Sequence, residues 1–284
     1  YEPDKFAEHV MKYKINHVLA GPADWTNFLE NEKALKHDFS HLVSMGSGSD
    51  KLNTKIKEEV NELVADRGGN YRVLEGYGQT EVGSAAVTNL PNIDVRDSVG
   101  VPFPKMSVAI FDDDNNELPY GSIGNICITG PTMMSSYYNN EEETKETMQK
   151  HADGTVWVHT GDIGYMTEDG TIFELTRGSA PRYGGGDLAT LPMENLLADA
   201  KIEGIDDEFF VIIPDEEHHR CFLPYLFVVL EDGYSVDDIR EKVTECLEPY
   251  MYPVDIIELE ERPFFHFKTN RIGLTNDILN GKFE

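Results

Sequence analysis

The chain has 284 residues, 40% hydrophobic and 10% aromatic, which predicts two or three packed units and excludes a disordered chain. Its 52 acidic and 24 basic residues give a formal charge of -28, which argues against nucleic acid and anionic lipid as partners. The sequence contains no apolar run of membrane-spanning length and no secretory-type leader. The chain begins at Tyr1 without an initiator Met, so we expect sequence upstream of it.

Residues 1–90 alternate helical and strand-like patterns. Helices are expected at residues 4–14, at 23–35 and around the apolar positions between 52 and 64, which recur at helical spacing. Short apolar runs at 17–20, 42–45 and 71–74 predict strands between them. This alternation predicts parallel pairing, with the loops at the strand ends open to ligands.

From about residue 91 the pattern becomes β-rich. Strand-like runs at 107–111, 125–129, 157–159 and 171–174 are separated by turn residues, including Glu168-Asp169-Gly170. This indicates an antiparallel barrel-like subdomain over residues 91–176.

Residues 177–284 predict a small α+β C-terminal domain. A glycine-rich stretch from Arg177 to Asp187 has the composition of a joint between domains. Strand-like runs follow at 209–213 and 223–230, and Ser235 with Asp238 forms a capping-box pattern at the start of a helix.

The three cysteines, Cys127, Cys221 and Cys246, are far apart and lack metal-ligand spacing. Cys127 lies between two isoleucines and is interpreted as a small buried hydrophobic residue. A reduced, cytoplasmic compartment fits this usage.

The clearest motif is Gly76-Tyr77-Gly78-Gln79-Thr80-Glu81, directly after the predicted strand at 71–74. Its glycines let the backbone turn tightly beside a ligand. Thr80 offers a hydroxyl to a phosphate, Glu81 offers a hard oxygen to Mg²⁺, and Tyr77 offers a flat ring to a base. On spacing alone, an ordinary loop between strand and helix explains the segment equally well.

Two shorter motifs add to it. In His159-Thr160-Gly161-Asp162, the carboxylate can accept hydrogen bonds from two vicinal hydroxyls, as on a ribose, although Thr-Gly-Asp alone is typical of a turn. The small residues Gly46-Ser47-Gly48 leave space for a planar group beside the backbone. They do not fit the GxxxxGK[ST] pattern, which excludes a phosphate-loop ATPase.

In order and spacing, these three motifs followed by Arg177 resemble the adenylate-forming (AMP-binding) superfamily. That family includes acyl- and aryl-CoA synthetases, luciferases and nonribosomal peptide adenylation domains. The resemblance covers essentially the whole chain as the C-terminal half of a family member. It extends to three further stretches: 97–102, 124–130, and Ser136-Tyr137-Tyr138 followed by Thr144.

The resemblance implies a role for each motif residue. Thr80 would contact phosphate, Glu81 would hold Mg²⁺, and Asp162 would bind the ribose hydroxyls. Arg177 would touch the ribose or the α-phosphate. The remaining nucleotide-binding residues would be Gly46, Ser47, Gly48, Tyr77, Gly78 and Gln79.

The reaction implied is activation of a small carboxylic acid by ATP through an acyl-AMP intermediate, followed by transfer to coenzyme A. Loading of a carrier-protein phosphopantetheine is an alternative, and so is a non-catalytic nucleotide-binding homologue. The family's phosphate loop ending in Pro-Lys is absent, so we expect this chain to be inactive alone.

Two departures concern the terminal domain. The family's near-terminal lysine falls at Thr269-Asn270-Arg271-Ile272, where Arg271 takes its place, and Lys268 substitutes if the register shifts; both are alternatively plain surface charges. The joint lacks the family's Arg-x-x-Asp-like pattern, and Pro181 fixes a backbone angle there, so we expect the pivot at 184–186. Asn125 stands where the family frequently has Glu.

Overall fold

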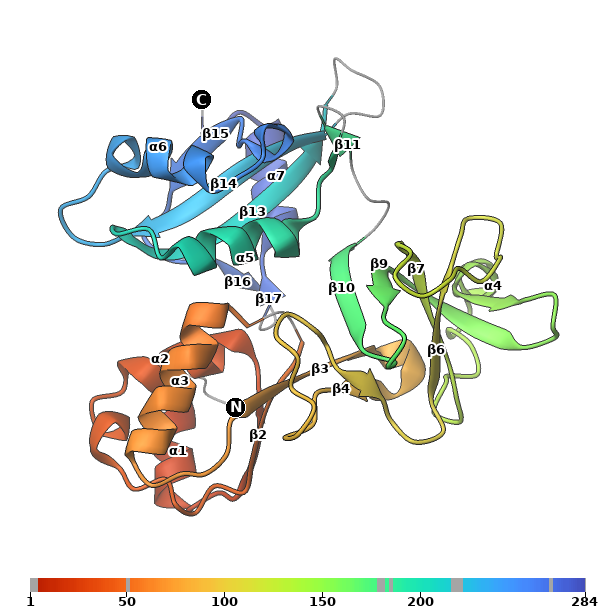
Figure 1. Ribbon diagram of the computed structural model, residues 1–284, viewed down its shortest axis with the longest axis horizontal. Coiled ribbons are helices and arrows are strands. Elements are labelled where there is room, and N and C mark those ends of the chain that lie inside the picture. Colours follow the sequence, from red (N-terminus) through yellow and green to blue (C-terminus); the bar gives the residue numbers. More distant parts are fainter. Residues whose placement is uncertain are drawn as a thin grey trace. The chain divides into compact units, whose positions relative to one another are not determined.

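The structure is a computed structural model that describes residues 5–49, 52–177, 182–183, 186–215, 222–265 and 268–283. The chain divides into two compact units, Tyr1–Gly178 and Ser179–Glu284, each of which is described by itself (Figure 1). Among the described residues, no helix combines the length and apolarity needed to cross a membrane.

The first unit begins with a five-stranded sheet in the order β1-β2-β3-β4-β5. Its parallel strands are β1 (His17–Ala20), β2 (Ser44–Ser47) and β3 (Val73–Gln79), and its antiparallel strands are β4 (Ser84–Thr88) and β5 (Val101–Pro102). The helices α1 (Phe6–Lys12), α2 (Pro22–Glu30) and α3 (Thr54–Asp66) and the 3₁₀ turn η2 (Ala34–Lys36) lie beside the parallel strands (Figure 1).

The helices bury an apolar core against one face of this sheet. Trp25 and Phe28 of α2 are each 1% exposed, and Val60 of α3 and Val73 of β3 are fully buried in the same cluster. In contrast, Leu19 is 79% exposed on the opposite face of the sheet. The alternation along β1 and β2 therefore places every second side chain in the core.

Local sequence explains where the helices begin. The N–H of Gly21 donates to the Asp24 carboxylate at 2.9 Å, with proline at the first helical position of α2. The Asn53 side chain accepts from the Lys55 N–H at 2.8 Å and caps α3.

The second sheet of this unit has the order β10-β9-β7-β6, with β8 paired to β9. Its strands are antiparallel, with bounds β6 (Ser107–Phe111), β7 (Gly124–Thr129), β8 (Met148–Lys150), β9 (Val156–Met166) and β10 (Ile172–Arg177). A short helix, α4 (Glu141–Thr147), precedes β8. Cys127 is fully buried, as expected, and burial raises the pKa of its thiol to about 12.

The second unit is built on the three-stranded sheet β13 (Ile205–Pro214), β14 (Phe222–Leu230) and β15 (Asp255–Glu258). Its helices are α5 (Thr190–Ala200), α6 (Val236–Glu245) and α7 (Arg271–Leu279), with the 3₁₀ turn η4 (Pro249–Met251). Two small ribbons complete the unit: β11 (Arg182–Tyr183) with β12 (Gly186–Asp187), and β16 (Phe264–Phe265) with β17 (Lys268–Thr269).

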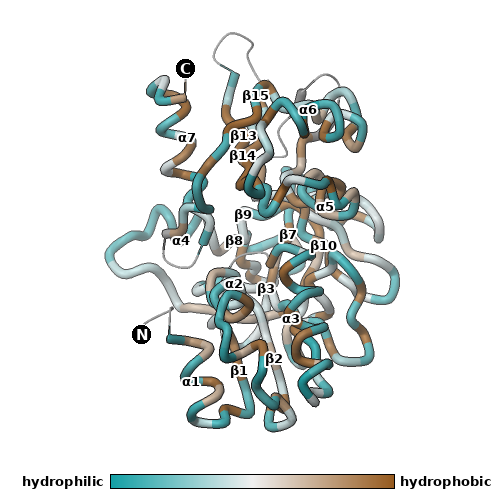
Figure 2. Tube along the Cα trace, turned by 90° about the vertical axis from the view of Figure 1, so that its left-hand side faces the viewer, coloured by the Kyte–Doolittle hydropathy of each residue, from teal (hydrophilic) through white to brown (hydrophobic). Residues whose placement is uncertain are grey.

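Residues of β13 and β14 contribute to two separate apolar clusters, so both faces of this sheet are covered. Figure 2 shows the hydropathy along these strands. Phe210 belongs to the core shared with α5 and α6, whereas its neighbour Phe209 belongs to the core shared with α7. The predicted capping box at Ser235 is present, because its N–H donates to the Asp238 carboxylate at 2.9 Å. The predicted fold class, a partial α/β subdomain with a barrel-like β subdomain and a small α+β domain, is confirmed.

Candidate functional site

The Gly76–Glu81 motif does not lie in a loop after a strand, which corrects the expectation from the sequence. Gly76 to Gln79 form the second half of β3, Thr80–Val82 make the 3₁₀ turn η3, and β4 returns antiparallel. A register shift between Tyr77 and Gly78 lets the two backbones approach closely, since a Cβ at Gly78 would collide with the Ser84 carbonyl oxygen. The motif therefore forms a tight hairpin. The apolar run at 71–74, which predicts a strand, covers only the start of β3.

Thr160-Gly161-Asp162 also lies within a strand, β9, and not in a turn between strands. Opposite β7, the pairing moves from Cys127↔His159 to Asn125↔Ile163, so the motif is a bulge. Gly161 has a φ of 77°, and a Cβ there would meet nothing within 4 Å. The Thr160 hydroxyl donates to the Ile126 carbonyl at 2.7 Å and accepts from the Asp162 N–H at 3.1 Å. These bonds hold the bulge without a ligand.

The fold joins these two motifs directly. The Tyr77 hydroxyl donates to Asp162 Oδ2 at 2.7 Å, although the residues are 85 positions apart. Their side chains are buried, with 8% and 4% exposure for Tyr77 and Asp162. Burial, and then the Asp162 charge, raise the pKa of Tyr77, so the phenol stays protonated and donates. The carboxylate is therefore oriented by a neutral donor beside the open backbone of Gly161.

Glu81 and Thr80 lie in the η3 turn that follows. Glu81 is half-buried and Oε1 accepts from the Tyr137 hydroxyl at 2.6 Å, while Thr80 is exposed. Among the described residues, no group of three or more His, Cys, Asp or Glu side chains is arranged to hold a metal. A single carboxylate still fits Mg²⁺ when the ion is bound through substrate phosphates, since Mg²⁺ then needs only one or two carboxylates from the protein.

Gly46, Ser47 and Gly48 lie at the end of β2, the parallel neighbour of β3. Ser47 is opposite Glu75, one residue before the Gly76 motif. A Cβ at Gly46 would press on the Leu19 side chain at 3.0 Å, whereas one at Gly48 would meet nothing within 4 Å. The Ser47 hydroxyl is buried without a hydrogen-bond partner in the described structure. This segment therefore leaves space beside the backbone at Gly48, and the Ser47 hydroxyl can still make a hydrogen bond.

Arg177 ends β10, with its backbone opposite Asp162 in the β10–β9 pair. Its position along the sheet thus adjoins the Thr160–Asp162 bulge. The predicted pivot lies mostly outside the described residues, because Pro181 and the glycines at 184 and 185 are not among them.

The structure of the second unit distinguishes Arg271 from Lys268, the two candidates for the family's near-terminal lysine. Arg271, the first residue of α7, pairs with Glu194 Oε1 at 3.0 Å and donates from Nε to the Phe210 carbonyl at 3.2 Å. Lys268, in β17, is exposed, and its ammonium makes no hydrogen bond or ion pair to any described residue. Arg271 is thus engaged within its own unit, whereas the Lys268 side chain is exposed.

No role for Tyr137 follows from the sequence. It lies in a stretch that resembles the family, but its hydrogen-bond partner, Glu81, lies 56 residues earlier. No local pattern signals a contact of that range.

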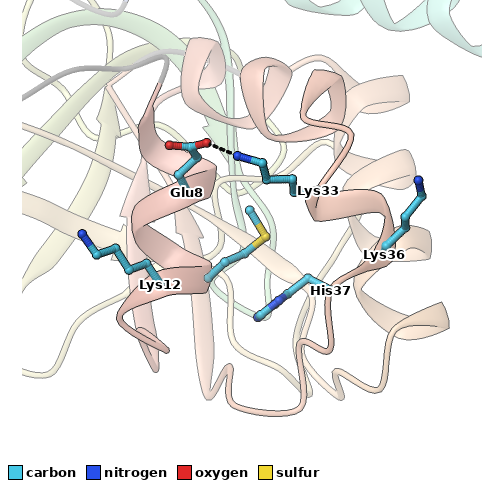
Figure 3. A pocket seen from close by; sticks show the side chains of 6 residues that line it. Glu8, Lys12, Lys33, Lys36 and His37 are labelled. Carbon is cyan, nitrogen blue, oxygen red and sulfur yellow. Dashed lines mark hydrogen bonds and ion pairs between the residues drawn. The ribbon is translucent and has the colours of Figure 1, made fainter.

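A cavity of about 480 Å³ lies elsewhere in the first unit and involves none of the motif residues. Glu8 and Lys33 point toward one another across it, at 2.7 Å (Figure 3). The rest of its lining is Met11, Lys12, Lys36 and His37. It has no side chain in common with the candidate nucleotide site.

Comparisons with known proteins identify relatives of this chain. A family model described as AMP-binding enzyme matches residues 1–138. Luciferin 4-monooxygenase of Photinus pyralis is 32% identical over 252 residues, covering 86% of this chain and 44% of that protein. Long-chain-fatty-acid–CoA ligase of Salmonella typhimurium is 36% identical over 260 residues, covering 90% of this chain and 44% of that protein.

Among solved structures, an anthranilate CoA ligase in complex with anthranoyl-AMP superposes with a TM-score of 0.82 at 21% identity. The superposition covers 99% of this chain and 53% of that one, and at this identity it establishes the fold alone. The chain spans less than half the length of the luciferin 4-monooxygenase and the fatty-acid ligase.

Proposed function

This chain belongs to the adenylate-forming superfamily of AMP-binding enzymes, and we propose that it is part of an ATP-dependent ligase that activates a small carboxylic acid as its acyl-AMP and passes the acyl group to coenzyme A. The observation that carries the proposal is the hydrogen bond from Tyr77 to Asp162. It brings together the two motifs that the family uses for the nucleotide and fixes a buried carboxylate beside an open glycine backbone.

The resemblance to the family and the geometry together support a role for each residue. Asp162 would accept hydrogen bonds from the two ribose hydroxyls. Gly46 and Gly48, with Tyr77, would line the adenine, and the exposed Thr80 hydroxyl would donate to a phosphate oxygen. Glu81 would hold Mg²⁺, which when bound would neutralise charge on the phosphates.

The proposed chemistry turns a poor leaving group into a good one. A substrate carboxylate oxygen attacks the α-phosphorus of ATP; an oxygen–phosphorus bond forms, and the bond to pyrophosphate breaks. A coenzyme A thiolate then attacks the acyl carbon, and AMP leaves with the bonding electron pair. Protein side chains contribute positioning and stabilisation of charge.

Lys268 is the better candidate for the cation that meets the reacting oxygens. Its side chain is exposed, whereas the Arg271 guanidinium is paired with Glu194. We therefore propose Lys268 as the catalytic cation and Arg271 as a residue that stabilises the second unit.

Two alternatives lie within the family. A carrier-protein phosphopantetheine would replace coenzyme A without any change in the nucleotide site. A non-catalytic nucleotide-binding homologue is favoured by the Arg271–Glu194 pair, which engages the residue at the family's lysine position.

Binding of ribose variants tests the proposal. Calorimetric titration of the 284-residue chain with Mg·ATP and with Mg·2′,3′-dideoxy-ATP should give weaker binding of the dideoxy compound. In Asp162→Asn, the ratio of the dissociation constants of the two nucleotides should fall to near one while the variant stays folded. Equal binding of both nucleotides by the wild-type chain, or no binding of either, would contradict the ribose site.

A second assay separates the alternatives. ATP–pyrophosphate exchange over a panel of acids should be undetectable for this chain alone, and exchange by the chain would overturn that expectation. In a longer protein that includes this chain and a Pro-Lys phosphate loop, exchange should depend on one class of acid. Nucleotide binding without exchange for any acid would favour the non-catalytic alternative.

A further inference from the structure

We propose that Tyr137 is a positioning residue for Glu81, and that the segment Thr132–Tyr137, which we call the strap, fixes the η3 turn for cation binding. The proposal rests on the proposed function, because Glu81 is a cation ligand only if the site binds ATP with Mg²⁺. It assigns a role to residues for which the resemblance implies none.

Three hydrogen bonds join the strap to η3. The Thr132 hydroxyl donates to the Val82 carbonyl at 2.6 Å, and the Met134 N–H donates to the Glu81 carbonyl at 2.8 Å. The Tyr137 hydroxyl donates to Glu81 Oε1 at 2.6 Å. The strap therefore holds both the backbone and the side chain of Glu81.

The strap is itself anchored at its far end. The Tyr137 N–H donates to Thr144 Oγ1 at 3.0 Å, and the same hydroxyl donates to the Asn140 carbonyl at 2.7 Å. The Asn140 side chain caps α4 by accepting from the Glu143 N–H at 3.2 Å. The Thr144 hydroxyl, seven residues after Tyr137, therefore sets where the tyrosine backbone lies.

The Tyr137 phenol is the donor in its hydrogen bond to Glu81, because a carboxylate oxygen accepts. Because it occupies Oε1, Oε2 is the carboxylate oxygen left for a cation, and the side chain is held in one rotamer before the cation arrives.

Preorganisation of this kind predicts a selective defect. Tyr137→Phe removes one hydrogen bond to a carboxylate and leaves the ring and the backbone bonds of the strap in place. A hydrogen bond to a carboxylate is worth about tenfold or more, and only the part of it that holds the Glu81 rotamer bears on the cation. The factor by which Mg²⁺ strengthens ATP binding should therefore fall about three- to tenfold. ATP binding in EDTA should stay unchanged, since Tyr137 does not contact the nucleotide side of the motif.

The experiment is calorimetric titration of the 284-residue chain with ATP in EDTA and in Mg²⁺, comparing wild type with Tyr137→Phe, Glu81→Gln and the double variant. Tyr138→Phe is the matched control, because Tyr138 is adjacent and 92% exposed. The Mg²⁺ factor should be lost in Glu81→Gln, and adding Tyr137→Phe to it should change nothing further. Hydrogen exchange of the Met134 amide should remain protected in Tyr137→Phe, which would show that the strap is intact.

The outcomes are distinct. The positioning role is overturned if Mg²⁺ strengthens ATP binding by Tyr137→Phe as much as by wild type, or if the variant loses ATP affinity equally with and without Mg²⁺. Neither result affects the proposed nucleotide site. ATP binding by the wild-type chain without any Mg²⁺ factor refutes Glu81 as a cation ligand and the positioning role with it. No ATP binding by the wild-type chain refutes the proposed function itself.

Discussion

Replacing Tyr77 by Phe tests how the candidate site is held together. The substitution removes one hydroxyl and keeps the ring, so apolar packing in the core is preserved. What is lost is the 2.7 Å hydrogen bond to Asp162, whose side chain is 4% exposed. A buried carboxylate that loses a donor is destabilised because water does not replace the donor.

The expected loss follows from that environment. A hydrogen bond to a charged group contributes about 1.5 to 3 kcal/mol, and the burial of both partners places this one within that range. For a unit of this size, a loss of about 2 kcal/mol lowers the melting temperature by about 4–8 °C.

Tryptophan fluorescence gives a clean assay for this unit. The chain has two tryptophans, Trp25 and Trp157, and both lie in the first unit, so urea unfolding followed by their emission reports that unit alone. Tyr120→Phe is the control, because Tyr120 is 61% exposed and its substitution should change stability by less than about 0.5 kcal/mol. If Tyr77→Phe were as stable as this control, the hydrogen bond would not hold Asp162 and the reasoning would be wrong.

Three further results are expected. In Gly78→Ala the unfolding free energy of the first unit should fall by several kcal/mol, because the new Cβ would collide with the facing backbone. Gly48→Ala should unfold like wild type, because its Cβ would meet nothing within 4 Å. Equal urea midpoints for the two variants would contradict the close approach at Gly78. Burial, and then a second imidazole 2.9 Å away, lower the pKa of His159. In the unfolded chain His159 takes up a proton near pH 6.5, whereas in the folded unit it does so only at lower pH, so the unfolding free energy should fall as the pH drops from 7 toward 5. His159→Asn should reduce this dependence of the unfolding free energy on pH. An unchanged pH dependence would exclude His159 as its source. Arg271→Ala should destabilise the second unit by about 1–2 kcal/mol in urea unfolding followed by circular dichroism, and Lys268→Ala by less than about 0.5 kcal/mol. The reverse order would favour Arg271 over Lys268 as the catalytic cation.

Much of the architecture could be predicted from local sequence. Apolar residues at helical spacing from Leu52 to Val64 identified α3, and Ser235 with Asp238 identified the start of α6. These predictions succeed because helix periodicity and capping depend on neighbours within a few residues. The motifs around Tyr77 and Asp162 were also recognisable, since a resemblance in order and spacing requires no contact between them.

The strand boundaries were less predictable where glycines were involved. Gly78 and Gly161 are typical of turns, yet both lie inside strands, at irregularities of pairing. A bulge depends on the pairing register with the facing strand, which is β4 for Gly78 and β7 for Gly161, and the residues of the motif do not specify that register. Sequence alone therefore placed these segments in loops.

The sequence by itself determined the family, the fold class and the identity of the polar groups that the site contains, because these follow from local pattern and from ordered motifs. Tertiary structure decided which groups meet: Tyr77 with Asp162 across 85 positions, and Tyr137 with Glu81 across 56. It also decided that Arg271 is occupied by Glu194 and that Lys268 is exposed. The physical reason is that a hydrogen bond between distant residues depends on how sheets and units pack, and no periodicity along the chain encodes that packing.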